Sequence, residues 1–348
     1  MKTARIVSPA LGLILVAFAA APRTSGKIDA EVPPRLEHYL THTARLSADQ
    51  RRALESGAPI TKLLDVHETE EVAVFGAVWI DAPVERYVEQ LKDIEAFESG
   101  KGFNVTRRIG SPPKLEDFAG LRLPEKDLKD LRSCRVGDCD VKLGEEALRR
   151  FRTEVDWDAA DAPEAANALM RRIAFEYVSG YLEGGNGRLA VYRDSSRPTF
   201  VAREFREMTD GMPELTTYMP ALRRHLLEYP GLELTGSTSF LYWQETEFGL
   251  KPTIRISHVT IKEHREGAIV ASKMLYASHY FWTGLELRAL LPDRSRGRGF
   301  WFVTVNRSRS DGMTGFLGLF VRPRVRSRVQ SGMLSALVRT KEKVEAGS

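Results

Sequence analysis

Cysteine is scarce in this sequence, because its 348 residues include only Cys134 and Cys139, within the stretch CRVGDC. A structural zinc site needs about four ligands, and no further ligands stand at suitable spacing nearby, so the pair does not predict a metal site. In an oxidising compartment two cysteines this close most simply form a local disulfide. We therefore predict a disulfide between Cys134 and Cys139 that fixes a loop and restrains the unfolded chain by about 2 kcal/mol.

Motifs of common catalytic chemistry are also missing. The sequence has no Gly-x-Ser-x-Gly elbow, no Cys-His pairing and no paired acidic motif, which leaves hydrolysis without support. The glycine-rich stretch 184–187 is not followed by Gly-Lys-Ser or Gly-Lys-Thr, so it predicts the end of a helix rather than a phosphate loop. His38 and His42 have no third ligand nearby in the sequence. We predict neither a metal nor a cofactor.

Long apolar runs are absent except near the start of the chain. Lys2 and Arg5 precede a weakly polar to apolar run from Ala10 to Ala21, which is shorter than the ~20 residues of a spanning helix. This layout is typical of a secretory signal peptide, which we assign to residues 1–26. An uncleaved anchor is the alternative, and no cysteine follows that would indicate a lipoprotein. We expect a periplasmic or secreted protein.

Net charge is nearly absent once residues 1–26 are removed, because 48 basic residues then face 47 acidic ones. The distribution is uneven, with thirteen Lys and Arg but four Asp and Glu from Arg288 to the C-terminus. Such asymmetry indicates either an anionic partner or a solvated basic face. Export argues against a nucleic-acid partner, and we predict none.

The stretch from Ala268 to Leu291 is the richest in β-branched, aromatic and apolar residues, and it contains no proline. As one strand it would extend ~80 Å at ~3.3 Å per residue, so we predict two strands with a turn between Ala277 and Trp282. When successive side chains are assigned to alternate faces of these strands, neither face is purely polar. Such strands are covered on both sides, or they form the wall of a cavity.

The surrounding chain divides into three parts. Residues 27–70 predict a linker and helices, and residues 71–345 predict an α+β domain. Within that domain, residues 145–227 predict a mainly helical insertion. The patterns predict strands at residues 71–81, 103–110, 238–248, 253–263 and 300–307, and helices at residues 84–97, 125–132 and 162–182.

The end of the chain combines apolar and basic residues. Phe316 to Val321 is apolar, and Pro323 is expected to break the segment. Residues 324–344 then predict an amphipathic helix with an apolar stripe and arginines around it. The segment from Phe316 to Arg328 fits transient contact with an anionic membrane, and a helix packed on the sheet with its polar side in water is the alternative.

The order of elements resembles the START-like, or SRPBCC, helix-grip superfamily, on the residues EVAVFGAVWIDAPVERYVEQLKDIEAF from Glu71 to Phe97 and on Ile254 to Val344. The resemblance implies a curved antiparallel sheet that grips a C-terminal amphipathic helix around an apolar cavity. It also implies binding of a lipid, sterol or hopanoid, while some members are cyclases or hydratases. The helical insertion departs from the family pattern, and the family supplies no catalytic motif to transfer.

Residues of the predicted sheet give the candidate site. Lys273 and His279 share the parity of Leu275 and Phe281, so both point into the cavity if the strand keeps its register, and a bulge near Ala277 reverses this. Buried Lys273 would need a partner such as Glu245. The predicted ligand-binding residues are Trp243, Glu245, Lys273, Leu275, His279, Phe281 and Trp301.

The sequence thus predicts an exported binding or transfer protein for a hydrophobic small molecule. The alternative is an enzyme on the same scaffold with His279 as general base, for which a hydrogen-bonded core histidine is the competing interpretation. A structural module whose middle helices bind a partner is a third hypothesis.

Overall fold

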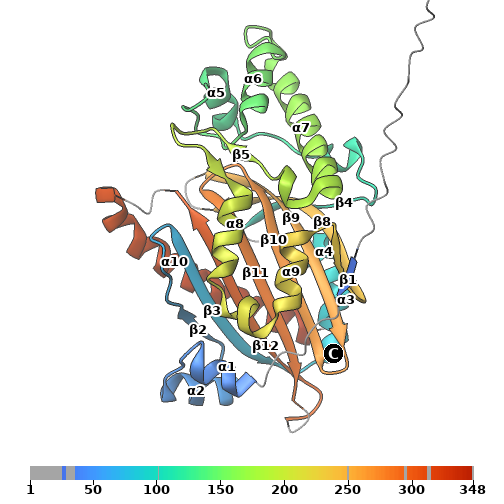
Figure 1. The fold of residues 1–348 in the computed structure, drawn as a ribbon, viewed down its shortest axis with the longest axis vertical. Helices are drawn as coiled ribbons and strands as arrows, with labels where there is room; N and C mark the ends of the chain where they lie inside the picture. The colour runs from blue at the N-terminus through green and yellow to red at the C-terminus, as the bar shows by residue number, and fades with distance from the viewer. Residues whose placement is uncertain are drawn as a thin grey trace, which may run out of the picture.

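A computed structural model describes residues 26–28 and 36–346, except residues 101, 249–250, 294–295 and 312–314 (Figure 1). The predicted signal peptide therefore lies outside the described residues, apart from Gly26. The protein has an α+β fold with a large antiparallel sheet and a C-terminal helix.

The described residues form one sheet of eight strands in the order β2-β3-β12-β11-β10-β9-β8-β4, and all neighbours are antiparallel. The short strand β2 was not predicted from the sequence, whereas the other seven were. The strands are β2 (Ile60–Leu63), β3 (Glu71–Ile80), β4 (Phe103–Ile109), β8 (Ser237–Phe248), β9 (Lys251–His264), β10 (Gly267–Ala277), β11 (Phe281–Pro292) and β12 (Phe300–Ser310).

The apolar stretch 268–291 forms the two neighbouring strands β10 and β11, as predicted. The turn between them contains Tyr280, whose φ of 62° places it in the left-handed region. The pairing of β10 with β9 shifts register between Met274 and Tyr276. This bulge reverses which face of the sheet the following residues point to.

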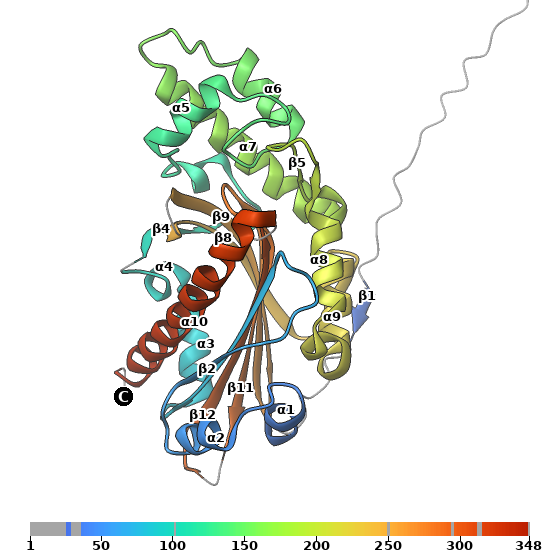
Figure 2. The same cartoon turned by 90° about the vertical axis from the view of Figure 1, so that its left-hand side faces the viewer.

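One face of the sheet carries α3 (Val84–Lys92), α4 (Ile94–Phe97) and α10 (Gly315–Glu345), and Figure 2 shows α10 running along it. The predicted apolar stripe of α10 is confirmed, because Met333, Leu337 and Val344 are buried in this core. The predicted break at Pro323 is wrong, since the helix continues through it.

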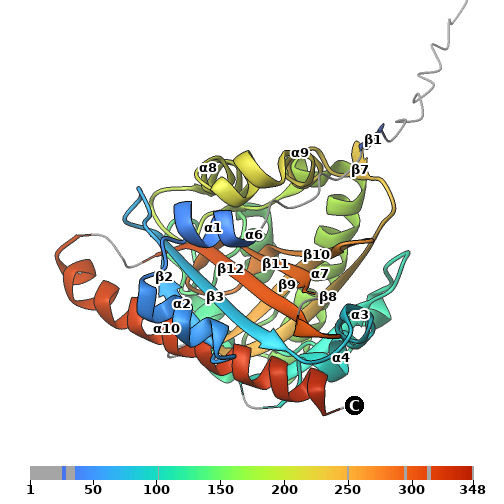
Figure 3. The same cartoon turned by 90° about the horizontal axis from the view of Figure 1, so that it is seen from below.

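The opposite face carries α1 (Leu36–His42), α8 (Val201–Asp210) and α9 (Pro220–Glu228), as the view from below shows (Figure 3). The helix α2 (Ala48–Glu55) contacts β2 and β3 and begins with Ser47 as its N-cap. The η3 turn (Glu214–Tyr218) connects α8 to α9. Apolar side chains from these helices and the sheet form one buried core.

The middle of the chain forms a helical region at one end of the sheet, which contains α5 (Glu125–Ser133), α6 (Glu145–Thr153) and α7 (Ala162–Gly184) (Figure 2). Its core includes Phe118 and Phe151 and extends onto the sheet at Trp243 and Ile254. The helix α7 ends where glycines were predicted to stop it, and Gly185 follows with a φ of +58°. The remaining short elements are β1 (Gly26–Ile28), η1 (Leu115–Phe118), η2 (Gly185–Arg188), β5 (Val191–Tyr192), β6 (Thr199–Phe200) and β7 (Leu232–Leu234).

Within the described ranges, none of the helices is both long and apolar enough to cross a membrane.

The helix α10 packs directly against β3 at Gly76. A Cβ atom at Gly76 would lie 3.0 Å from Leu337 Cδ1 and 3.0 Å from Met333 Cγ. We therefore expect Gly76→Val to lower the free energy of unfolding by about 1–3 kcal/mol through overpacking, measured by urea unfolding. Gly332→Ala on α10 is the control, since no atom lies within 4 Å of its added Cβ. Loss of stability in the control but not in Gly76→Val would contradict this packing.

Candidate functional site

A cleft of about 2210 Å³ lies between α10 and the sheet face that α10 covers. Typical small-molecule pockets measure about 300–1,000 Å³, so this cleft has room for a large ligand. Residues of the helical region contribute to its wall at one end.

The helical wall of the cleft contains an apolar stripe flanked by charged and polar residues such as Arg324, Arg328 and Lys343. Val325, Val329 and Met333 stand at intervals of four residues on α10 and line the cleft, followed by Ala336 and Leu337. Met333 and Leu337 are buried, whereas Val325 and Val329 are only partly buried. The apolar stripe thus packs on the sheet near the C-terminal end of α10. Near the N-terminal end of α10 the same stripe faces the cleft.

The sheet wall carries a row of polar side chains. Cross-strand neighbours Ser272, Glu286 and Asn306 form a row over β10, β11 and β12, and Ser308 lies in the next row beside Gly284. Apolar side chains complete this wall, and they are Val72, Val74, Tyr242, Met274, Phe281 and Phe302.

A buried network of charges lies in the sheet wall. Arg288 is 6% exposed and donates to both carboxylate oxygens of Glu286, at 2.9 and 2.7 Å. The Arg288 guanidinium also lies 3.9 Å from Glu98, which accepts from the Gln244 amide at 3.0 Å. Arg255 donates to the oxygen of the same amide at 3.0 Å. Burial raises the pKa of Glu98, and the nearby arginines oppose that shift.

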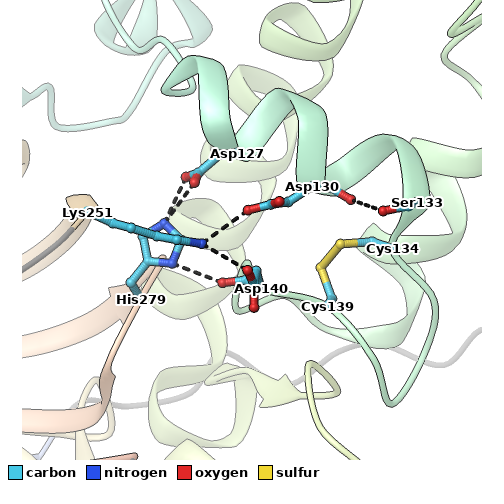
Figure 4. The surroundings of a disulfide bond; sticks show 8 residues. All are labelled: Asp127, Asp130, Ser133, Cys134, Cys139, Asp140, Lys251 and His279. Carbon is cyan, nitrogen blue, oxygen red and sulfur yellow. Dashed lines mark hydrogen bonds and ion pairs between the residues drawn. A yellow bond between two sulfur atoms is a disulfide. The ribbon is translucent and has the colours of Figure 1, made fainter.

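The end of the cleft next to the helical region is formed where the disulfide loop meets the turn after β10, whose side chains Figure 4 shows. The predicted disulfide is present, with Cys134 and Cys139 joined at an S–S distance of 2.01 Å. The Asp140 carboxylate follows it directly and accepts from the Lys251 ammonium at 3.2 Å. Asp130 on α5 accepts from the same ammonium at 3.1 Å. Although burial opposes it, these hydrogen bonds raise the pKa of Lys251.

His279 is held by protein groups at both ring nitrogens. Its Nδ1 lies 2.9 Å from the carbonyl oxygen of Asp140, and its Nε2 lies 2.9 and 3.0 Å from the two carboxylate oxygens of Asp127 (Figure 4). Because a carbonyl only accepts, Nδ1 carries a proton. The Asp127 carboxylate lies against Nε2, and both side chains are almost fully buried. Both ring nitrogens are therefore occupied by protein groups and do not point into the cleft.

Of the predicted ligand-binding residues, His279 and Phe281 line the cleft. Lys273 and Leu275 lie on the opposite face, so the expectation that Lys273 and His279 share one face is wrong. The bulge between Met274 and Tyr276 is the reason, because it reverses the alternation before His279 is reached.

The other predicted residues also lie away from the cleft. Trp243 is 1% exposed and packs in the core of the helical region, where its indole donates to the Asp117 carbonyl at 2.9 Å. Trp301 packs against Trp79 at 5.1 Å between ring centroids. Glu245 does not pair with Lys273 but accepts from the Asn104 amide at 2.8 Å, where β8 meets the edge strand β4.

Lys273 is buried under α7 and α9 together with His225 and His258. Its ammonium donates to the Asn186 side-chain oxygen and to the Leu226 carbonyl, and it lies over the rings of Tyr181 and Phe205. Burial lowers the pKa of Lys273 to about 7. Burial, followed by repulsion from Lys273 and His225, lowers the pKa of His258 to about 3.

The buried charges of the cleft were not predicted from the sequence. The alternation of Glu286 and Arg288 within an apolar strand was a signal that two charges share one face there. No comparable signal marked Asp127, because its partner His279 stands 152 residues later in the chain.

The described part of the chain contains no group of three or more His, Cys, Asp or Glu side chains placed to hold a metal ion.

Comparison with known proteins finds no matching family model, no matching curated protein and no matching solved structure.

The pairing of Asp127 with His279 predicts a structural role that mutation can test. We expect Asp127→Ala to lower the free energy of unfolding by about 1–3 kcal/mol, because it leaves Nε2 of the buried His279 ring without its hydrogen-bond partner. Asp127→Asn is the matched control, since its amide N–H can donate to an unprotonated Nε2 and preserve one hydrogen bond. Urea unfolding measures both. An alanine variant as stable as the parent would show that the pair contributes nothing.

The environment of Lys273 predicts a pH dependence of stability. The pKa is about 7 when folded and near 10.4 when unfolded, so between these values the unfolded chain binds more protons and stability rises with pH. Lys273→Met removes this contribution. From pH 7 to pH 9 we expect the free energy of unfolding of the parent to rise by about 2 kcal/mol relative to that of Lys273→Met. A difference that stays constant over this range, measured by urea unfolding, would contradict the assignment.

Proposed function

We propose that this protein binds or transfers a hydrophobic small molecule, of the lipid, sterol or hopanoid class, in the cleft between α10 and the sheet. The observation that carries the proposal is the apolar stripe of α10. Toward the N-terminal end of the stripe, Val325 and Val329 face a cleft of about 2210 Å³. An apolar ligand gains roughly 25 cal/mol per Å² buried against such a surface, which suffices to hold a lipid without chemistry.

The proposal includes a START-like, helix-grip architecture in which the sheet curves around α10. The order of strands and helices, the antiparallel sheet and the placement of α10 against it support this interpretation. Export to the periplasm or the exterior is part of the same proposal, and the disulfide near the cleft is compatible with an oxidising compartment.

A binding role is better supported than the alternative of an enzyme with His279 as general base. A general base needs a nitrogen that can reach a proton of the substrate. Both ring nitrogens of His279 already hold protein partners, Asp127 and Asp140.

The proposal also includes transient contact with an anionic membrane through the segment Phe316 to Arg328. The side chains of residues 316–321 lie outside the described residues, so the apolar half of the segment stays a prediction. In the other half Arg324 and Arg328 are exposed and line the cleft. Such arginines at the cleft are suited to attract anionic headgroups while a ligand enters.

Filling the cleft tests the proposal. We expect Ala336→Trp, which places an indole in the cleft, to weaken binding of a saturable apolar fluorescent probe at least tenfold, because it removes volume that the probe occupies. Ser335→Trp is the matched control, since Ser335 is exposed and does not line the cleft. Native mass spectrometry of the purified full chain would also detect a copurified lipid. A parent protein that binds neither a probe nor a lipid would contradict the proposal.

A further inference from the structure

The sheet wall of the cleft contains polar side chains that no protein group satisfies. Ser272, Asn306 and Ser308 are partly exposed and line the cleft on β10 and β12. Within the described part of the chain, the side chains of these three residues make no hydrogen bond to protein groups. A serine hydroxyl both donates and accepts, and an asparagine amide offers two donors and one acceptor oxygen.

These side chains lie close together because of the strand register. Ser272 pairs with Glu286, and Glu286 pairs with Asn306 on the next strand. Ser308 stands two residues after Asn306 and therefore points to the same face of β12. The polar group thus spans three neighbouring strands, with spacings of about 5 Å between strands.

The charges beside this polar group are already neutralised by one another. Glu286 accepts from Nε and Nη2 of Arg288, and the Arg288 guanidinium lies 3.9 Å from Glu98. Beside the polar group, a charged ligand group would have to compete with this buried ion pair, which is costly because the displaced charge would lose its partner. The exposed cations of the cleft, such as Arg324 and Arg328, are on α10 instead. Uncharged hydroxyl groups can instead bond to the free serine and asparagine side chains.

The opposite wall has different chemistry. On α10, Val325, Val329 and Met333 offer apolar surface to the cleft, beside the exposed Arg324 and Arg328. A ligand that satisfies both walls has an apolar part against the helix and an uncharged polar part against the sheet.

We infer that the ligand is an uncharged amphiphile with several hydroxyl groups, such as a glycolipid or another lipid polyol, whose hydroxyl groups bind Ser272, Asn306 and Ser308 while its apolar part lies on α10. This inference rests on the proposed function and specifies the ligand class of the same cleft.

Three amphiphiles with the same twelve-carbon chain test the inference on the full chain. Dodecyl maltoside is uncharged and rich in hydroxyl groups, dodecanoate is anionic, and dodecyltrimethylammonium is cationic. Isothermal titration below the micelle concentration measures each dissociation constant. We expect the maltoside to bind at least tenfold more tightly than either charged amphiphile.

A double variant, Asn306→Ala with Ser308→Ala, tests the residues directly. We expect it to weaken maltoside binding about tenfold, through the loss of two hydrogen-bonding side chains, and to leave dodecanoate binding unchanged. Ser335→Ala, on the exposed side of α10, is the control and should bind all three amphiphiles as the parent does. The unchanged dodecanoate affinity also shows that the double variant is folded.

The outcomes separate the two proposals. Equal affinities for the three amphiphiles, a preference for a charged one, or an unaffected double variant would overturn the inference and leave the proposed function standing. If none of the three binds, the proposed function is itself wrong, and the inference falls with it.

Discussion

The contact between α10 and β3 at Gly76 is the constraint on which the cleft depends. The missing side chain at Gly76 lets Met333 and Leu337 approach the sheet, where a Cβ atom would lie 3.0 Å from each. Seating the helix there buries Met333, Leu337 and Val344, and it leaves Val325 and Val329 facing the cleft. One apolar stripe therefore does two things, because it anchors the helix and it forms a wall of the cleft.

The two faces of the sheet differ in how fully they are closed. The face under α1, α8 and α9 is packed with apolar side chains and encloses Lys273, which no carboxylate neutralises among the described residues. The face under α10 keeps an open cleft whose polar groups are either paired, as in Arg288 and Glu286, or available to a ligand. The bond between His279 and Asp127 joins the helical region to the sheet at the end of this cleft.

The sequence was sufficient to predict seven of the eight strands of the sheet, the disulfide, the helical region and the amphipathic stripe of α10, because each rests on local periodicity or spacing. It was insufficient for the site, since a single bulge between Met274 and Tyr276 placed Lys273 and His279 on different faces. Alternation in a strand cannot show where such a bulge occurs. Pro323 is a second limit, because tertiary context tolerates a proline within α10 that local propensity would exclude.

The central claim is that an amphiphile lies between α10 and the sheet, and methyl-resolved NOE spectroscopy of the full chain tests it most directly. With dodecyl maltoside bound, the account predicts NOEs from its alkyl chain to the methyl groups of Val325, Val329 and Met333. Leu287, whose side chain packs on the opposite face, should show none. NOEs to Leu287 without any to the α10 methyl groups would contradict the account.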